Sequence, residues 1–110
     1  MNAKKAIKSL PASEVVSASL STVDFNLIDN GTLTKACFAL KFSNYANQII
    51  LISFDGETIH ESIWPQHEFV LGNFRDYSFA KGTKIYMRRA GAASGTVYVS
   101  KYYVDSSPTI

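Results

Sequence analysis

The chain has 110 residues, of which 46% are hydrophobic, 13% aromatic and 18% charged, and its formal net charge is +2. This length holds one domain, and the apolar content is that of a chain that folds, which excludes an extended disordered protein. The 11 basic and 9 acidic side chains nearly balance, which argues against a protein whose main partner is nucleic acid.

Residues 1–13 carry few large apolar groups and include Lys4, Lys5, Lys8 and Pro11. Such a segment has little to pack against a core, so we predict a flexible basic N-terminal arm over residues 1–13. The arm is either a frayed terminus or a strap that orders on a neighbouring subunit. The remaining residues, 14–110, are predicted to form the folded domain.

From Glu14 onwards, apolar residues recur with a period of two, which is typical of a half-buried strand. The period changes phase at Ser21-Thr22, which predicts a bend or bulge within a long strand. Asp29-Asn30-Gly31 contains residues that tolerate positive φ, and it predicts a turn into a strand over 35–42. The single cysteine, Cys37, lies in that strand and is expected to be a half-buried structural thiol, since no intrachain disulfide is available.

The run 48–54 is apolar, rich in β-branched residues and too short for a stable helix, so we predict a central buried strand there. Asp55-Gly56 is a strong hairpin signal, with the return strand expected over 57–63. Trp64-Pro65-Gln66 ends that strand, because proline has no amide hydrogen to donate. The tryptophan is either a plug at the end of the core or an exposed anchor.

Three further strands are predicted over 67–71, 83–89 and 96–104. Between the first two, residues 72–82 are irregular but aromatic, which indicates a loop that folds down on the domain. About eight short strands with no helical stripe predict an all-β, antiparallel two-sheet β-sandwich, jelly-roll or Ig-like, with an extended N-terminal arm.

A catalytic centre needs several polar groups that converge on one pocket. His60 and His67 flank the proline turn, and with nearby glutamates they are the best candidates for a metal site, but their spacing matches no known ligand pattern. No phosphate-binding glycine loop, nucleophile elbow or calcium loop is present. We therefore expect no catalytic residue, no cofactor and no metal, and a protein that is not an enzyme.

Basic and aromatic residues alternate in 84–89 and 100–103. This pattern suits either a stacking platform for single-stranded nucleic acid or an ordinary amphipathic strand pair, and the low net charge favours the strand pair. Exposed tryptophan, tyrosine and arginine residues are also typical of protein interfaces. The candidate interface residues are Lys4, Lys5, Lys8, Trp64, Tyr77, Arg88, Arg89 and Tyr102.

Three motifs carry a resemblance to a known class. Ile52-Ser53-Phe54-Asp55-Gly56 precedes a segment that begins Lys81-Gly82-Thr83, and the chain closes with Ser94-Gly95-Thr96-Val97-Tyr98-Val99-Ser100 and Tyr102-Tyr103. This order resembles small virion structural proteins of tailed bacteriophages, over a little more than half of the chain. Residues 1–43 carry no matching motif.

The resemblance implies a capsid decoration or cement protein that bridges major capsid subunits, often as a homodimer or homotrimer. The expected location is the capsid surface of the virion, after synthesis in the host cytoplasm. No segment has the length and apolarity of a membrane span, so no membrane partner is expected. The alternatives are a head-tail connector, a tail or fibre-associated protein, or a glycan- or nucleic-acid-binding β module, for which a cluster of Trp64, Tyr77, Arg88 and Tyr102 would be diagnostic.

Overall fold

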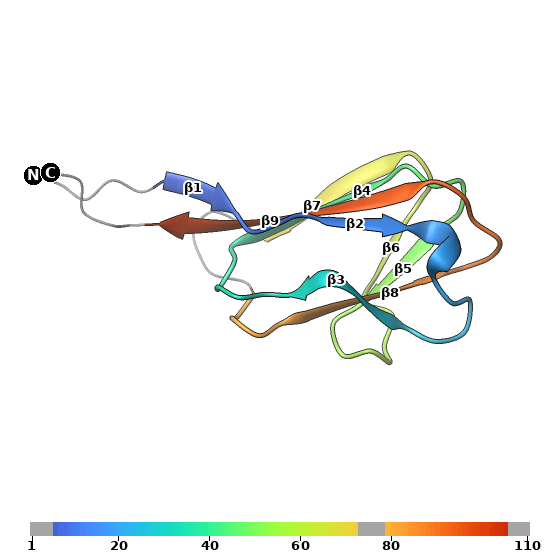
Figure 1. Cartoon of the computed structure of the whole chain (residues 1–110), viewed down its shortest axis with the longest axis horizontal. Coiled ribbons are helices and arrows are strands. Elements are labelled where there is room, and N and C mark those ends of the chain that lie inside the picture. Colours follow the sequence, from blue (N-terminus) through green and yellow to red (C-terminus); the bar gives the residue numbers. More distant parts are fainter. Residues whose placement is uncertain (1–5, 73–78, 106–110) are drawn as a thin grey trace, which may run out of the picture.

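The computed structural model describes residues 6–72 and 79–105, which form nine strands and one short 3-10 helix (Figure 1). The elements are β1 (Ala6–Ser9), β2 (Ser13–Val16), η1 (Ser17–Ser19), β3 (Asn26–Thr32), β4 (Ala39–Asn44), β5 (Ile50–Ser53), β6 (Glu61–Ile63), β7 (His67–Gly72), β8 (Lys84–Arg89) and β9 (Thr96–Asp105).

The strands form two antiparallel sheets that pack face to face, which confirms the predicted β-sandwich. The five-stranded sheet has the order β1-β9-β4-β7, with β2 also paired to β9, and the four-stranded sheet has the order β3-β8-β5-β6. The pairs β2–β9, β3–β8, β4–β7 and β5–β6 are those of one long hairpin with its tip between β5 and β6. The pairs β4–β9 and β5–β8 join the strands of this hairpin within each layer.

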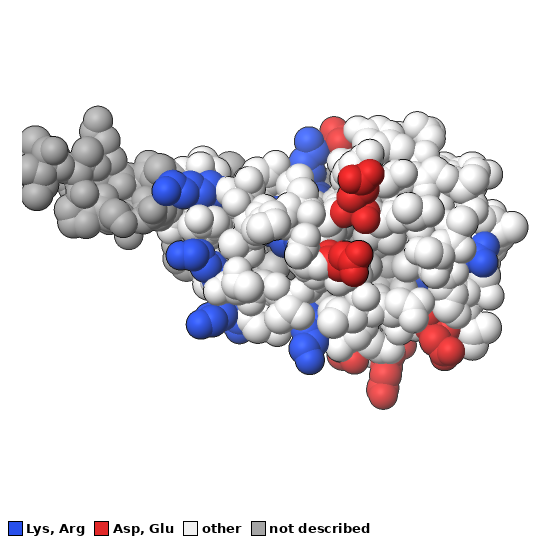
Figure 2. Space-filling model, viewed as in Figure 1, with Lys and Arg blue, Asp and Glu red and all other residues white. Residues whose placement is uncertain are grey.

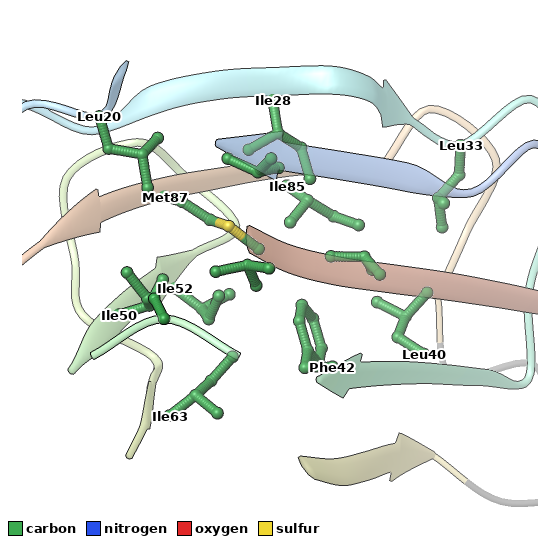
Figure 3. Close-up of a cluster of buried hydrophobic side chains, with 14 of the residues drawn as sticks. Leu20, Ile28, Leu33, Leu40, Phe42, Ile50, Ile52, Ile63, Ile85 and Met87 are labelled. Carbon is green, nitrogen blue, oxygen red and sulfur yellow. The ribbon is translucent and has the colours of Figure 1, made fainter. Parts of the chain in front are cut away.

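The core lies between the two layers, where side chains from both sheets point toward one another (Figure 3). Phe42, Leu40, Val97 and Val99 come from the five-stranded sheet, and the four-stranded sheet contributes the second set, Ile28, Ile50, Ile52, Ile63, Ile85 and Met87. Each fully buried aliphatic or aromatic side chain stabilises the fold by about 1.5–3 kcal/mol. Period-two alternation in the strands thus builds one continuous core.

The N-terminal segment differs from the predicted flexible arm. Residues 6–9 and 13–16 both pair with β9, and only residues 1–5 of the predicted arm lie outside the described chain. Ser9 lies opposite Tyr102 and Ser13 opposite Val99, so three residues around Pro11 face two on β9 and form a bulge. In the sequence, Pro11 favours an unstructured arm. In the structure it lies in this bulge of an edge strand, where the missing amide hydrogen is tolerated.

The long strand predicted from Glu14 is interrupted. The chain leaves the five-stranded sheet after Val16, passes through η1 and a bend, and enters the other sheet at Asn26. The Ser17 hydroxyl donates to the carbonyl of Gly95 over 2.8 Å, and the Arg89 Nε donates to the carbonyl of Leu20 over 2.6 Å. The phase change at Ser21-Thr22 therefore marks a crossing between layers.

Asp29-Asn30-Gly31 lies within β3, where the sequence predicts a turn. Asn30 has a φ of 56°, and the register between β3 and β8 shifts between Leu27 and Thr32. A Cβ on Gly31 would lie 2.7 Å from the Ile28 carbonyl oxygen, so only glycine fits this bulge. Positive φ serves a bulge as well as a turn, and the same residue types favour both.

The second half of the chain follows the prediction closely. The Asp55 carboxylate accepts hydrogen bonds from the Glu57 and Thr58 amides and from the Ser53 hydroxyl, which holds the pKa of Asp55 well below its ordinary value. This loop joins β5 to β6, whose first residue, Glu61, comes later than predicted. The Trp64–Gln66 turn carries the chain from one sheet to the other.

Only Gly72 and residues 79–82 of the predicted irregular stretch 72–82 are described, so Phe74 and Tyr77 lie outside the described residues. Phe79 forms an isolated bridge with Cys37 and packs against the core.

Candidate functional site

The outer face of the five-stranded sheet carries a distinctive surface. Alternate residues of β9, β4 and β7 face outward and lie in rows across the strands. In one such row Tyr102 lies opposite Ala39, and Ala39 lies opposite Gly72. A large ring beside two of the smallest residues leaves a depression in the sheet surface.

This depression is a groove of about 530 Å³. Its lining is almost wholly apolar and consists of Ile7, Phe38, Ala39, Lys41, Val70, Gly72 and Tyr102. Ile7 is 59% exposed and Val70 is 56% exposed, so both apolar walls face solvent. Exposed apolar surface gathered in one concave patch is typical of an interaction site.

The floor of the groove depends on Gly72. Its φ is 101°, and a Cβ there would lie 2.0 Å from the carbonyl oxygen of Phe38. Any other residue would force β7 away from β4, so the glycine keeps both the strand pairing and the hollow.

Charged and aromatic residues follow the groove along the same face. Lys41 Nζ lies 3.7 Å from the Glu68 carboxylate, which also accepts a hydrogen bond from the Ser43 hydroxyl over 2.9 Å. Glu14, on β2, lies opposite Tyr98 on β9, and Tyr98 in turn lies opposite Ser43 on β4. Glu14 and Glu68 therefore lie in the same row as Ser43, which is the next row after that of Lys41 in the direction away from the groove.

Two exposed tyrosines end this face. The rings of Tyr45 and Tyr98 are 5.8 Å apart at 65°, an edge-to-face contact, and Tyr45 is 54% exposed. We call these two residues the aromatic pair. The same face thus carries a groove near one end and a projecting pair of rings near the other.

A second surface lies at the end of the sandwich where β1 begins and β9 ends (Figure 1). Lys35 lies 5.1 Å from the centre of the Tyr103 ring, and Lys8 is opposite Tyr103 on β1. Lys81 and Lys84 flank a turn whose Gly82 amide donates to the carbonyl of Leu33. On the face shown in Figure 2, most lysine and arginine side chains lie toward this end, although a basic side chain also lies at the far end, and the acidic side chains lie over the middle and the far end. We call Lys8, Lys35, Lys81 and Lys84 the basic end.

Sequence reasoning missed the position of Lys101, which the alternation of basic and aromatic residues places on the surface. Lys101 is 1% exposed because it follows Val97 and Val99 on the inward face of β9. Its ammonium group donates to the Pro11 carbonyl oxygen over 2.8 Å. Burial lowers the pKa of Lys101 below its ordinary value. The alternation of inward and outward residues along this strand is the one sequence feature that indicates burial of Lys101, since it places residue 101 on the same side as Val97 and Val99.

Cys37 is fully buried, whereas the sequence predicts a half-buried thiol. Burial raises the pKa of this thiol, and the nearby charge of Lys101 offsets part of that effect. A protonated, inaccessible thiol is a poor nucleophile, so the geometry fits a structural residue.

The structure separates most of the predicted interface residues. Lys4, Lys5 and Tyr77 lie outside the described residues, and Lys8 is part of the basic end. Tyr102 lines the groove. Trp64 is 61% exposed at the turn between β6 and β7, so the tryptophan projects from the surface and the core-plug interpretation is wrong.

The two arginines bind the segment that connects the two sheets between η1 and β3. The Arg88 guanidinium lies 5.1 Å from the centre of the Phe25 ring and donates to the carbonyl of Thr22, and Arg89 binds Leu20 as described above. Arg88 is on the outer face of the four-stranded sheet and Tyr102 on that of the other sheet. Arg88 and Tyr102 therefore do not lie in one cluster, which was the arrangement predicted to distinguish a glycan- or nucleic-acid-binding module.

The histidines take part in local turns. His60 Nδ1 accepts the Phe54 amide hydrogen over 3.0 Å, and His67 Nδ1 lies 2.8 Å from the Pro65 carbonyl oxygen. Across residues 6–72 and 79–105 no group of three His, Cys, Asp or Glu residues has the arrangement of a metal site. The described chain also has no helix with the length and apolarity to cross a bilayer.

Comparison with known proteins finds no family model, no curated protein and no solved structure that matches this chain.

Proposed function

We propose that this chain is a non-enzymatic structural protein of a bacteriophage particle, a decoration or cement protein that binds major capsid subunits and stabilises the shell. The observation that carries the proposal is the basic end, where Lys8, Lys35, Lys81 and Lys84 lie together. The groove of about 530 Å³ is a second interaction surface, an exposed apolar hollow on a sheet face. It suits contact with another protein, since patches of this kind mark interaction surfaces. It also has few polar groups with which to orient a small substrate.

Strand order supports the same class of function. The orders β2-β9-β4-β7 and β3-β8-β5-β6 favour a jelly roll, in which one long hairpin is wrapped into two layers. Jelly rolls are common in capsid and lectin domains. A fold alone does not define a function, so the order adds to the surface features and to the sequence resemblance without replacing them.

The basic end is the surface we assign to the capsid. Lys8, Lys35, Lys81 and Lys84 lie at one end of the sandwich, around Tyr103 and the turn that contacts Leu33. A complementary acidic surface on assembled subunits would raise the rate of docking and fix its orientation. A protein that binds the assembled lattice alone stabilises that lattice by mass action.

The test uses capsids assembled without this chain. Purified full-length protein is mixed with them, and bound protein is measured by co-sedimentation at low and high salt. We expect saturable binding that weakens with salt, and shells that survive to a higher temperature. The triple variant K35E/K81E/K84E should lose binding, while E57K, a charge reversal away from the basic end, should keep it.

No binding to capsids by the wild-type chain, or equal binding by the triple variant, would contradict the proposal. Binding to tails in place of shells would favour the tail or connector alternative.

A further inference from the structure

The groove and the aromatic pair lie on one face of one sheet, and together they make that face complementary to itself. We propose that two copies of this chain associate face to face through the outer face of the five-stranded sheet, each copy placing Tyr45 in the groove of the other. The proposal needs only this chain and stands apart from the virion role.

The row structure of the sheet defines the arrangement. Along β4 the outward residues are Ala39, Lys41 and Ser43, at successive rows. Tyr45 directly follows the strand, and its ring packs against that of Tyr98 on the same face. A two-fold axis in the plane of the interface, perpendicular to the strands and level with Phe42, reverses this order between copies. Tyr45 of the second copy then lies over Ala39, the floor of the groove. Every contact occurs twice, so the interface closes as a dimer.

Charge agrees with this axis. The reversal places the row of Lys41 over the row that holds Ser43, Glu68 and, on β2, Glu14 of the second copy. Each lysine therefore faces acidic groups. An axis parallel to the strands would instead place each row over itself and bring Lys41 near Lys41 of the second copy.

The available area is adequate for a dimer of modest affinity. The strands of this sheet have 4, 4, 6, 6 and 10 residues, and at about 3.3 Å per residue and about 4.8 Å between strands they present a face of roughly 500 Å². Stable interfaces bury about 800 Å² on each partner. The groove and the projecting rings make the real area of this face larger than the estimate for a flat sheet. Interlocking surfaces also exclude water better than flat ones.

The arrangement also orients the basic ends. Reversal of the strand direction places the two basic ends at opposite ends of the dimer, so that the dimer presents two separate lysine clusters. Such a dimer is suited to bridging two binding sites.

Sedimentation velocity of the full-length chain over a micromolar concentration series tests the pairing. We expect the wild type to shift from monomer to dimer as concentration rises. Y45S should remain monomeric, because it removes the ring that fills the groove. The control V23S removes an exposed apolar residue that lies away from this face, beside Arg88, and should dimerise like the wild type.

Two charge reversals make the test specific to this axis. K41E and E68K should each be monomeric alone, since each homodimer would bring like charges together. An equal mixture should form a heterodimer, because the carboxylate introduced at position 41 of one copy then meets the ammonium group introduced at position 68 of the other. Near-ultraviolet circular dichroism of each variant checks that it is folded.

A wild type that stays monomeric throughout the series would overturn the pairing, and so would charge variants that dimerise alone as well as the wild type does. A folded mixture that fails to associate would overturn this axis. Capsid binding by a monomeric wild type would leave the virion role standing, and a dimer that binds no capsid would remove that role alone.

Discussion

The Lys101 ammonium group donates a hydrogen bond to the Pro11 carbonyl oxygen over 2.8 Å, although the Lys101 side chain is 1% exposed. Pro11 lies in the bulge between β1 and β2, so this bond ties the N-terminal edge strand to the inside of β9. No described acidic side chain forms a salt bridge with this lysine. A buried ammonium without a carboxylate is costly to desolvate, so we infer that the role of the bond is to fix the bulge.

Methionine has a similar volume and no charge to desolvate, so replacement of Lys101 by methionine should raise the free energy of unfolding by about 1 kcal/mol at pH 7, although the bond to Pro11 is lost. The folded-state pKa of Lys101 lies below its unfolded value of 10.5, so wild-type stability should rise with pH as the folded lysine loses its proton. Urea denaturation at pH 7 and near pH 10 should show that the difference in stability between K101M and the wild type becomes smaller at the higher pH. A variant less stable than the wild type at both pH values would show that the bond outweighs the desolvation.

The two glycines Gly72 and Gly82 allow a matched comparison. Both have positive φ, 101° and 92°, but a Cβ meets the Phe38 carbonyl oxygen at 2.0 Å in the first case and nothing within 4 Å in the second. G82A should cost about 1 kcal/mol from backbone strain alone. G72A should cost about 3 kcal/mol or more, because β7 must also move from β4. Equal urea midpoints for the two variants would contradict the close contact.

Asn44 fastens the two sheets at the end opposite the basic end. Its Nδ2 donates to the carbonyls of Gln48 and Ile63 over 3.0 and 2.9 Å, and its Oδ1 accepts the Ala46 amide hydrogen over 2.9 Å. N44A should lower the free energy of unfolding by about 2–3 kcal/mol, because buried partners lose their bonds.

N44D should be less stable than N44A at pH 7, since a buried carboxylate would face two carbonyl oxygens. Thermal unfolding of both variants relative to wild type, at pH 7 and near pH 4, checks this, and N44D should recover in part at the lower pH. An N44D protein as stable as the wild type would contradict the assigned bonds.

The Asp55 loop should make stability depend on pH in the acidic range. The folded-state pKa of Asp55 lies below its unfolded value of 3.8, so the carboxylate stabilises the fold above about pH 4, and this contribution is lost as the pH falls further. D55N should flatten the acid limb of a plot of urea midpoint against pH. An acid limb unchanged in D55N would assign the dependence to other carboxylates.

Period and turn chemistry predicted most of the fold. The Asp55-Gly56 hairpin, the break at Pro65 and the last two strands follow from local rules, because the residues that decide them are neighbours in the sequence. The turn predicted at Asn30-Gly31 is wrong, since a bulge inside a strand demands the same positive φ. A bulge differs from a turn here because β3 stays paired with β8 on both sides of Asn30-Gly31. That pairing joins segments far apart in the sequence, so local residue types do not predict it.

The binding surfaces were harder to predict. Tyr102 can be identified from its residue type, but the groove needs Ala39 and Gly72 beside it, and only the register across three strands brings them together. Residue type places Lys101 on the surface because lysine is rarely buried, although its position in the alternation favours the core. Arg88 and Tyr102 both have the composition of interface residues, and the pairing of the strands places them on opposite faces.

Electron cryomicroscopy of intact particles that contain this chain is the most direct test of its role as a shell protein. We expect density for the sandwich on the outer surface of the capsid, with the basic end against the major subunits and two copies meeting through their five-stranded sheets. Particles that contain the chain at the tail or at another position, with no such density on the shell, would contradict the account.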